Sequence, residues 1–244
     1  MNNNLKIVIP AYKSEKWVTN TIRSVKGQSY TNFKCIFIDD NSPDDTFNVA
    51  KKAIEEDERF IFKKNENRVG ALQNINDGIY EICSNDEDII VTLDGDDWLS
   101  DKDVLKYLNE FYNDHKCLIT HGGFNDAPPP YQTDYSEDDK KHKKFRDYEI
   151  CRASHLRTFK FKLWRNIKRE DLIDPETGNF YSMTWDLAFM FPMLEMAGQK
   201  SKHHDRLMYI YNRDNPISDG YVNGAYQVAL GEKIKQKEKY KTLK

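Results

Sequence analysis

The sequence predicts an α/β protein with a mostly parallel central sheet flanked by helices. Two observations support this prediction. Short runs rich in Ile, Val and Phe alternate with amphipathic stretches of helical length, and the spacing between them suits right-handed βαβ units. A chain of 244 residues with 13% aromatic residues is also large enough to bury a core without disulfides.

Four strands are expected in the first 120 residues, in the segments LKIVIPAY, FKCIFIDD, RFIFKK and DIIVTLD. Continuous β-branched and aromatic runs of this kind are typical of strands buried on both faces. Helices are expected at residues 14–26, 43–56, 69–83 and 101–114. Ser14 and Ser42 are the predicted N-caps of the first two helices, and Pro43 follows Ser42 at a first helical position.

The second half of the chain has a less regular pattern. Residues 117–121 are expected to form a strand, and residues 122–144, which contain three consecutive prolines, to form a long loop. Helical spacing of apolar residues predicts helices at 152–169 and 184–196, the second apolar almost all round and therefore buried. A strand at 206–211 and a peripheral basic helix from residue 227 complete the expectation.

Charge is divided unevenly along the chain. Residues 1–139 carry 15 Lys and Arg against 27 Asp and Glu, whereas residues 140–244 carry 22 against 13. This asymmetry suggests different partners for the two halves. The basic, aromatic stretch at 140–169 has two interpretations that stay open: a surface for an anionic glycan, a phosphorylated lipid or a nucleic acid, or a solvated helix face.

The four cysteines are far apart and form no CxxC pair, so reduced thiols are expected rather than a zinc or redox site. No apolar run approaches the roughly 18 residues of a membrane span, and the N-terminus shows no signal-peptide pattern. We therefore expect a cytoplasmic protein without an integral membrane segment.

Chemistry-bearing residues follow three of the predicted strands, where each strand ends. Strand one ends in Pro10-Ala11-Tyr12, strand two in Asp39-Asp40, and strand four in Asp94-Gly95-Asp96-Asp97. Ligands of parallel sheets bind at this carboxyl edge. Several carboxylates on one turn repel each other unless a cation is present, and hard oxygen ligands select Mg²⁺ or Mn²⁺. The alternative is a turn that caps the helix starting near Asp101.

These segments resemble the family 2 glycosyltransferases of the Rossmann-like GT-A fold. The resemblance rests on VIPAYKSEKWVTNTIRSVKGQSYTNFKCIFIDDNSPDDT, RVGALQNINDGI and VTLDGDDWL, and covers residues 5–115. It continues more loosely through SHLRTFK, YSMTWDLAF and MYIYNRDNPIS. It implies one GT-A domain, with residues 1–120 as the nucleotide-sugar-binding half and residues 121–244 as the acceptor-side half with a basic tail.

The resemblance also implies roles for the donor-side residues. Asp94-Gly95-Asp96 looks like the Asp-x-Asp motif of the family, in which the last Asp ligates Mn²⁺ or Mg²⁺ and the first contacts the donor's ribose, making Asp94 a second candidate metal ligand. Tyr12, beside Pro10 and Ala11, resembles the residue that packs on the nucleotide base. Asp40 resembles the carboxylate that accepts the imide N–H of uracil. Arg68 and Gly70 open the third helix, where a diphosphate would bind.

The general base is expected on the acceptor side. Trp185-Asp186 resembles the site where the family places its base, with Trp in place of the usual Glu, and Asp171 and Asp174 are the fallback candidates. Arg213 resembles a residue of the segment that closes over the diphosphate, although the family's His is missing here.

The resemblance implies a metal-dependent inverting glycosyltransferase that uses a nucleotide sugar, UDP-linked by expectation, and transfers to a glycan or another hydroxyl-bearing acceptor. An anionic acceptor is one option, and nucleic acid is not excluded as a partner. Two alternatives stay open: a binding module that has lost catalysis, and a metal-dependent nucleotidyltransferase, which the missing Gly-rich phosphate loop after strand one disfavours.

Overall fold

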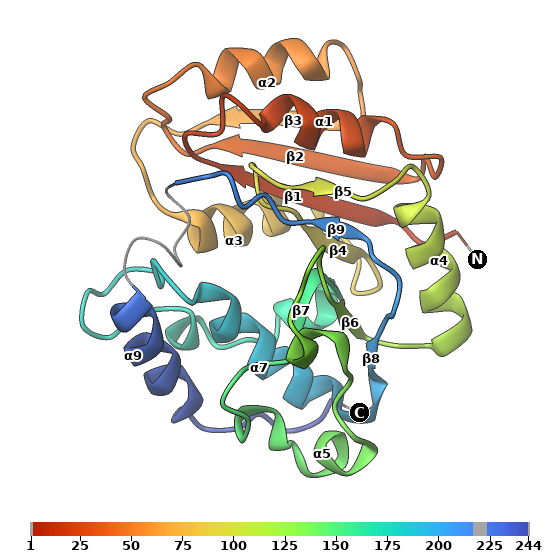
Figure 1. Ribbon diagram of the computed structural model, residues 1–244, viewed down its shortest axis with the longest axis vertical. Helices are drawn as coiled ribbons and strands as arrows, with labels where there is room; N and C mark the ends of the chain where they lie inside the picture. The colour runs from red at the N-terminus through yellow and green to blue at the C-terminus, as the bar shows by residue number, and fades with distance from the viewer. Residues whose placement is uncertain (1, 217–223, 244) are drawn as a thin grey trace.

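A seven-stranded sheet forms the centre of the structure, a computed structural model that describes residues 2–216 and 224–243 (Figure 1). Its strand order is β3-β2-β1-β4-β7-β6-β8. The strands are β1 (Leu5–Ala11), β2 (Phe33–Asp39), β3 (Phe60–Lys64), β4 (Ile89–Thr92), β6 (Ile119–Gly122), β7 (Ser154–Lys160) and β8 (Ser201–His203). Among the described pairings of this seven-stranded sheet, only the two that β7 makes are antiparallel. The predicted α/β class with a mostly parallel sheet is confirmed.

Helices cover both faces of this sheet. One face carries α1 (Val18–Lys26), α2 (Thr46–Ile54) and α4 (Val104–His115), which share an apolar cluster with β1, β2 and β4. The other face carries α3 (Ala71–Ile82), α6 (Phe161–Trp164), α7 (Trp185–Ala197) and α9 (Gly224–Lys235). Because successive strand residues point to opposite faces, Ile7 and Ile9 pack on the first cluster while Val8 packs on the second.

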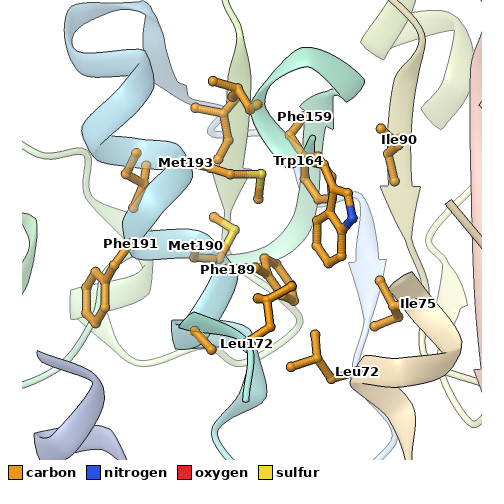
Figure 2. Close-up of a cluster of buried hydrophobic side chains, with 14 of the residues drawn as sticks. Leu72, Ile75, Ile90, Phe159, Trp164, Leu172, Phe189, Met190, Phe191 and Met193 are labelled. Atoms are coloured by element: carbon orange, nitrogen blue, oxygen red, sulfur yellow. The ribbon is translucent and has the colours of Figure 1, made fainter. Parts of the chain in front are cut away.

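The second cluster joins the two halves of the chain. Phe159 of β7 stacks on Trp164 of α6, with ring centroids 5.6 Å apart, and Phe189 of α7 packs against both (Figure 2). Leu72 and Ile75 of α3 lie beside them in the same cluster. As predicted, α7 is buried almost all round, and burial of each large apolar side chain there contributes about 1.5–3 kcal/mol.

All four predicted strands and all four predicted helices of the first 120 residues are confirmed, but the helices begin two to four residues later than expected. The N-cap predictions for Ser14 and Ser42 are wrong. Helices α1 and α2 begin after Trp17 and Asp45, neither of which caps its helix with a side-chain hydrogen bond. Instead, the Ser14 N–H donates to the Thr46 hydroxyl and the Lys13 N–H donates to the Ser42 hydroxyl, so both serines tie loops together at the carboxyl edge of the sheet.

The helix predicted at 152–169 is wrong. Most of this segment forms β7, which lies between β4 and β6 and is antiparallel to both, and only Phe161–Trp164 is helical. The same apolar residues also suit a strand that is buried on both faces. Leu156 and Phe159 are an odd number of residues apart, so Leu156 packs on one face of the sheet and Phe159 on the other. The local sequence is compatible with a helix and with a strand, and pairing with the two neighbouring strands decides for the strand.

The predicted loop at 122–144 contains a short helix, α5 (Glu137–His142), which begins with a capping box between Ser136 and Asp139. The strand predicted at 117–121 is β6. The strand predicted at 206–211 is only β9 (Tyr209–Ile210), which pairs with β5 (Trp98–Leu99). This small ribbon lies at the carboxyl end of β4 and brings residues 209–216 next to the Asp94 turn.

The basic half of the chain is largely paired with acids of its own molecule. Lys160 and Lys162 bind Glu87, and Arg165 binds Asp86. In the tail, the lysines at 233, 235, 237 and 239 all contact acidic side chains or backbone carbonyls of the body. Part of the charge asymmetry thus reflects intramolecular pairing. No helix in the described residues is long and apolar enough to span a membrane.

One ion pair anchors the tail. Arg146 donates to both carboxylate oxygens of Glu195, at 2.6 and 2.9 Å, and both side chains are buried. Arg146 also donates to the carbonyls of Ile234 and Lys237, and the Tyr240 N–H donates to Glu195. The pair therefore connects α7, the segment before β7 and the chain after α9.

We expect Glu195→Gln to lower the free energy of unfolding by about 3–5 kcal/mol, because it leaves the Arg146 guanidinium buried without its counter-ion. Urea denaturation followed by circular dichroism measures this change. The control is Glu232→Gln, which removes a carboxylate from an exposed ion pair with Lys235 and should cost less than about 1 kcal/mol. Equal effects of the two substitutions would contradict the anchoring role of Arg146 and Glu195.

Candidate active site

A cavity of about 660 Å³ opens at the carboxyl edge of β1, β2 and β4. Ten of the twelve site residues predicted from the sequence line it: Pro10, Ala11, Tyr12, Asp40, Arg68, Gly70, Asp94, Gly95, Asp96 and Trp185. Residues of the second half, including Phe180, Tyr211 and Asn215, also line it. The fold therefore brings together side chains from the ends of β1, β2, β4 and β9 and from the start of α3.

Three carboxylates lie on the turn that follows β4. The Tyr209 hydroxyl, which has one proton to donate, lies 2.5 Å from Asp97 Oδ2 and 3.2 Å from Asp94 Oδ2. The Asn215 amide donates to Asp96 at 2.6 Å. Burial raises the pKa of all three, and the neighbouring carboxylates raise the pKa of Asp94 and Asp97 further. The charged forms of these carboxylates are thus disfavoured at this turn, and a bound cation would offset that cost.

These carboxylates do not cap the next helix. Helix α4 begins after Asp103, which makes no side-chain capping bond, and the Asp103 N–H is satisfied by Asp101. The alternative reading of the turn as a helix cap is therefore wrong.

Gly95 is required by the close approach of the turn to the end of β1. A Cβ atom at this position would lie 2.5 Å from the Ala11 Cβ and 2.8 Å from the Pro10 carbonyl oxygen. The Gly95 N–H donates to that carbonyl, and its own carbonyl accepts from the Thr21 hydroxyl. The two strand ends that form the cavity floor are therefore in direct contact at this glycine.

We expect Gly95→Ala to lower the free energy of unfolding by about 1–3 kcal/mol, because the extra methyl group pushes the carboxylate turn away from β1. Thermal melts measure this effect. Gly224→Ala is the control, since a Cβ atom there meets no atom of the described residues within 4 Å beyond its chain neighbours and its own helix backbone. A Gly95→Ala variant with normal stability would rule out the tight contact.

Tyr12, Arg68, Asp40 and Gly70 form the other end of this cavity. The Arg68 guanidinium lies over the Tyr12 ring, 3.8 Å from its centroid. The Asp40 carboxylate accepts the backbone N–H groups of Val69 and Gly70, at 2.9 and 2.8 Å. Gly70 has a φ of +92°, a conformation that suits glycine, so this residue lets the chain fold back onto Asp40 before α3 begins.

A second cavity of about 470 Å³ adjoins the first, and the two share Asp94, Trp185 and Tyr211. Asp186 lines this second cavity from the first turn of α7, where a carboxylate is favoured by the helix dipole. Arg157 of β7 donates from Nη2 to Asp186 Oδ2 at 2.7 Å and contacts His155 Nδ1 through Nη1 at 3.3 Å. The carboxylate is therefore held in one orientation at the wall of the cavity.

The remaining candidates lie elsewhere. Arg213 lines neither cavity and donates to the Asp126 carbonyl at 3.2 Å. Asp171 accepts from the Tyr240 hydroxyl, and Asp174 belongs to a turn with Asn179, so neither fallback base faces the second cavity. The end of the MYIYNRDNPIS segment falls outside the described residues.

Sequence reasoning missed several residues of the site. Asp97 is named from the sequence as part of the acidic turn after β4 but is assigned no role. Tyr209 and Asn215 bind the carboxylates of this turn, and the only sequence signal for them is their place in MYIYNRDNPIS. Arg157 and His155 lie in the segment predicted as a helix, so the sequence prediction does not place them at the site. Their alternation with Leu156 along SHLRTFK is the signal that a strand interpretation would have used.

The carboxylate turn suits a divalent cation that is shared with a ligand. No group of three or more His, Cys, Asp or Glu side chains in the described parts of the chain is placed to hold a metal alone. Mg²⁺ is commonly bound through one or two carboxylates together with substrate phosphates and water. Asp94 and Asp96, both at the cavity wall and both desolvated, provide that kind of partial ligand set.

Comparison with known proteins identifies the family. Residues 6–188 match the family described as glycosyl transferase family 2. The chain belongs to this family. Similar curated proteins include an uncharacterized glycosyltransferase of Haemophilus influenzae, 30% identical over 122 residues, and a GalNAc(5)-diNAcBac-PP-undecaprenol beta-1,3-glucosyltransferase of Campylobacter jejuni, 27% identical over 125 residues. Each alignment covers 49% of this chain, and 46% and 40% of the two relatives.

Solved structures share the GT-A fold with this family 2 glycosyltransferase. S. aureus TarS 1-349 in complex with UDP-GlcNAc superposes with a TM-score of 0.65 at 16% identity, covering 95% of this chain and 66% of the other. The mannosyltransferase PcManGT from Pyrobaculum calidifontis, in complex with GDP-Man and Mn²⁺, gives a TM-score of 0.63 at 14% identity, covering 98% and 66%. The predicted family and GT-A fold are thus confirmed.

Proposed function

We propose that this protein is a metal-dependent, inverting glycosyltransferase that moves a hexose-type sugar from a UDP-linked donor to an acceptor hydroxyl. The observation that carries the proposal is the junction of the two cavities. The carboxylate turn with Asp96 lies on one side of it and Asp186 lies on the other. The sugar–phosphate bond of a donor in the first cavity would then face an acceptor in the second.

In this proposal the first cavity holds the donor. Tyr12 stacks on the base, and Asp40 accepts the N–H of the base through a carboxylate that the Val69 and Gly70 N–H groups already fix in place. Asp94 holds the ribose, and Asp96 with Asp94 would hold Mn²⁺ or Mg²⁺. The bound ion would supply positive charge for the leaving diphosphate.

Asp186 is the proposed general base. It takes the proton of the acceptor hydroxyl while that oxygen bonds to the sugar C1 and the bond from C1 to the diphosphate oxygen breaks, with inversion at C1. Since Arg157 binds Oδ2, we assign the proton transfer to Oδ1. Arg157 is a positioning residue in this scheme, because it fixes the carboxylate without touching the reacting atoms.

The second cavity favours an uncharged sugar as the reacting part of the acceptor. Its walls include the aromatic side chains of Phe124, Tyr131 and Tyr211, which suit the apolar face of a sugar ring. Among the described residues, the cations that line it are Arg157 and Lys235, and they are bound to Asp186 and Glu232. An anionic acceptor group would meet carboxylates here without an available cation.

The test is to incubate the purified protein with UDP-, GDP- and dTDP-sugars and Mn²⁺, and to measure release of nucleoside diphosphate with and without EDTA. We expect EDTA-sensitive release from a UDP-sugar, stimulated by neutral glycosides more than by uronides or sugar phosphates. Nucleotide binding without turnover on any acceptor would instead support a binding module. Absence of nucleotide binding would contradict the donor cavity itself. The cytoplasmic location stays a prediction.

A further inference from the structure

Asn74 carries a buried amide group that the proposed mechanism does not use. It lies in the first turn of α3, is 2% exposed and lines the first cavity. Its Nδ2 atom is buried and finds no hydrogen-bond partner within the described part of the chain. Buried amide groups are nearly always paired, and leaving one unpaired costs about 1–3 kcal/mol. An unpaired donor on a residue that lines a cavity is therefore a candidate ligand contact.

A chain of hydrogen bonds fixes which way this amide points. The Asp40 carboxylate accepts two backbone N–H groups and also accepts from Asn65 Nδ2 at 2.8 Å. Asn65 must therefore present its NH₂ group toward Asp40. The same nitrogen lies 2.7 Å from Asn74, so Asn74 must present its carbonyl oxygen there. Its own NH₂ group, with two N–H donors, is left for another partner.

Asp40 and Asn74 are close neighbours, because the single NH₂ group of Asn65 reaches both. Asp40 Oδ2 accepts the Gly70 N–H and keeps capacity for a further donor. The end of the cavity that holds Tyr12 thus presents a carboxylate acceptor beside a free amide donor. The complementary ligand edge has a ring N–H next to a carbonyl oxygen.

We propose that Asn74 Nδ2 donates to the exocyclic oxygen beside the ring N–H of the nucleotide base, O4 of uracil or O6 of guanine, and so selects the base of the donor. Cytosine and adenine carry an amino group at that position, beside an unprotonated ring nitrogen. The O2 carbonyl, which cytosine shares with uracil, would not discriminate between the two. This inference rests on the proposed function, in which Asp40 faces the base. It adds Asn74 as the residue that discriminates against cytosine.

Asn74→Asp tests the proposal with little structural change. The substitution keeps the oxygen that accepts from Asn65 and replaces only the NH₂ group by a second oxygen. Affinities of UDP, GDP, CDP and ADP would be measured by calorimetry in the presence of Mn²⁺. The added negative charge weakens every nucleotide alike, so the readout is the ratio of the UDP and CDP dissociation constants. We expect this ratio to change by about tenfold or more in favour of CDP.

The matched control is Asn76→Asp, which adds the same charge to the same helix at a residue outside the cavity lining. Its UDP to CDP ratio should equal that of the unsubstituted protein. If GDP is the nucleotide that binds most tightly, the base is guanine and the GDP to ADP ratio becomes the readout. An unchanged ratio in Asn74→Asp, with normal UDP binding by the unsubstituted protein, would overturn the assignment of Asn74.

A ligand-side measurement keeps the test independent of variant folding. The unsubstituted protein would be titrated with 2-thio-UDP and 4-thio-UDP, which retain the ring N–H and weaken one carbonyl acceptor each. We expect 4-thio-UDP to bind several-fold more weakly than UDP and 2-thio-UDP to bind about as tightly as UDP. Equal affinities for all three would contradict the proposal. If no nucleotide binds at all, the proposed function fails, which is a different result from unselective binding.

Discussion

Asp186→Asn is expected to lower kcat by roughly 10²–10⁴-fold and to leave the affinity for UDP nearly unchanged. The substitution keeps the shape of the side chain and an oxygen that accepts from Arg157, but it removes the ability to take a proton. Because Asp186 lines the second cavity and not the first, the donor contacts stay intact. Initial rates of sugar transfer and calorimetric titration with UDP measure the two effects on the same sample.

The control for this substitution is Asp171→Asn, which changes another acidic residue of the second half that faces neither cavity. We expect its kcat to stay within a few-fold of the unsubstituted protein. A normal transfer rate in Asp186→Asn, or a large loss in Asp171→Asn, would show that the base is a different residue.

Asp96→Asn is expected to abolish turnover, with a loss of at least about 10³-fold, because the neutral amide weakens metal and diphosphate binding together. The fold should be retained, since the amide oxygen can still accept from Asn215. Mn²⁺-dependent UDP binding should disappear, in contrast to Asp186→Asn. The two variants thus separate loss of the donor site from loss of proton transfer.

Asp101→Asn provides the matched comparison near the same turn. Asp101 pairs with Arg206 at the surface and lies outside both cavities. Its turnover and Mn²⁺ dependence should be close to normal. If Asp96→Asn retains Mn²⁺-dependent turnover, the carboxylate turn does not hold the metal, and the cofactor prediction is wrong.

Much of the donor half follows from local sequence. Runs such as LKIVIPAY and DIIVTLD have a strand pattern that needs no distant partner to be recognised, and parallel strands place their carboxyl ends at one edge. The gathering of Tyr12, Asp40 and Asp94 at one cavity could therefore be predicted from the order of strands and helices. Only the exact helix starts were wrong, because Ser14 and Ser42 bind neighbouring loops instead of capping.

The acceptor half depended on contacts between residues far apart in the chain. Residues 154–160 form β7 because their backbone groups pair with β4 on one side and with β6 on the other. This pairing places Arg157 beside Asp186. Part of the positive charge of residues 140–169, which suggested an external partner, is paired with Asp86, Glu87 and Glu195 of the same molecule. The alternation along SHLRTFK permits a strand there, but no local pattern indicates its partner strands or the acids that pair with these cations.

The sequence by itself determined the α/β class, the strands and helices of the donor half and the residues of the carboxylate turn, because these depend on side-chain patterns and strand ends within short segments. Only the tertiary structure decided where β7 pairs, which acid Arg157 holds, and which way the Asn74 amide points. Those features depend on long-range strand pairing and on hydrogen bonds between distant segments. Such interactions form only when the whole chain has folded.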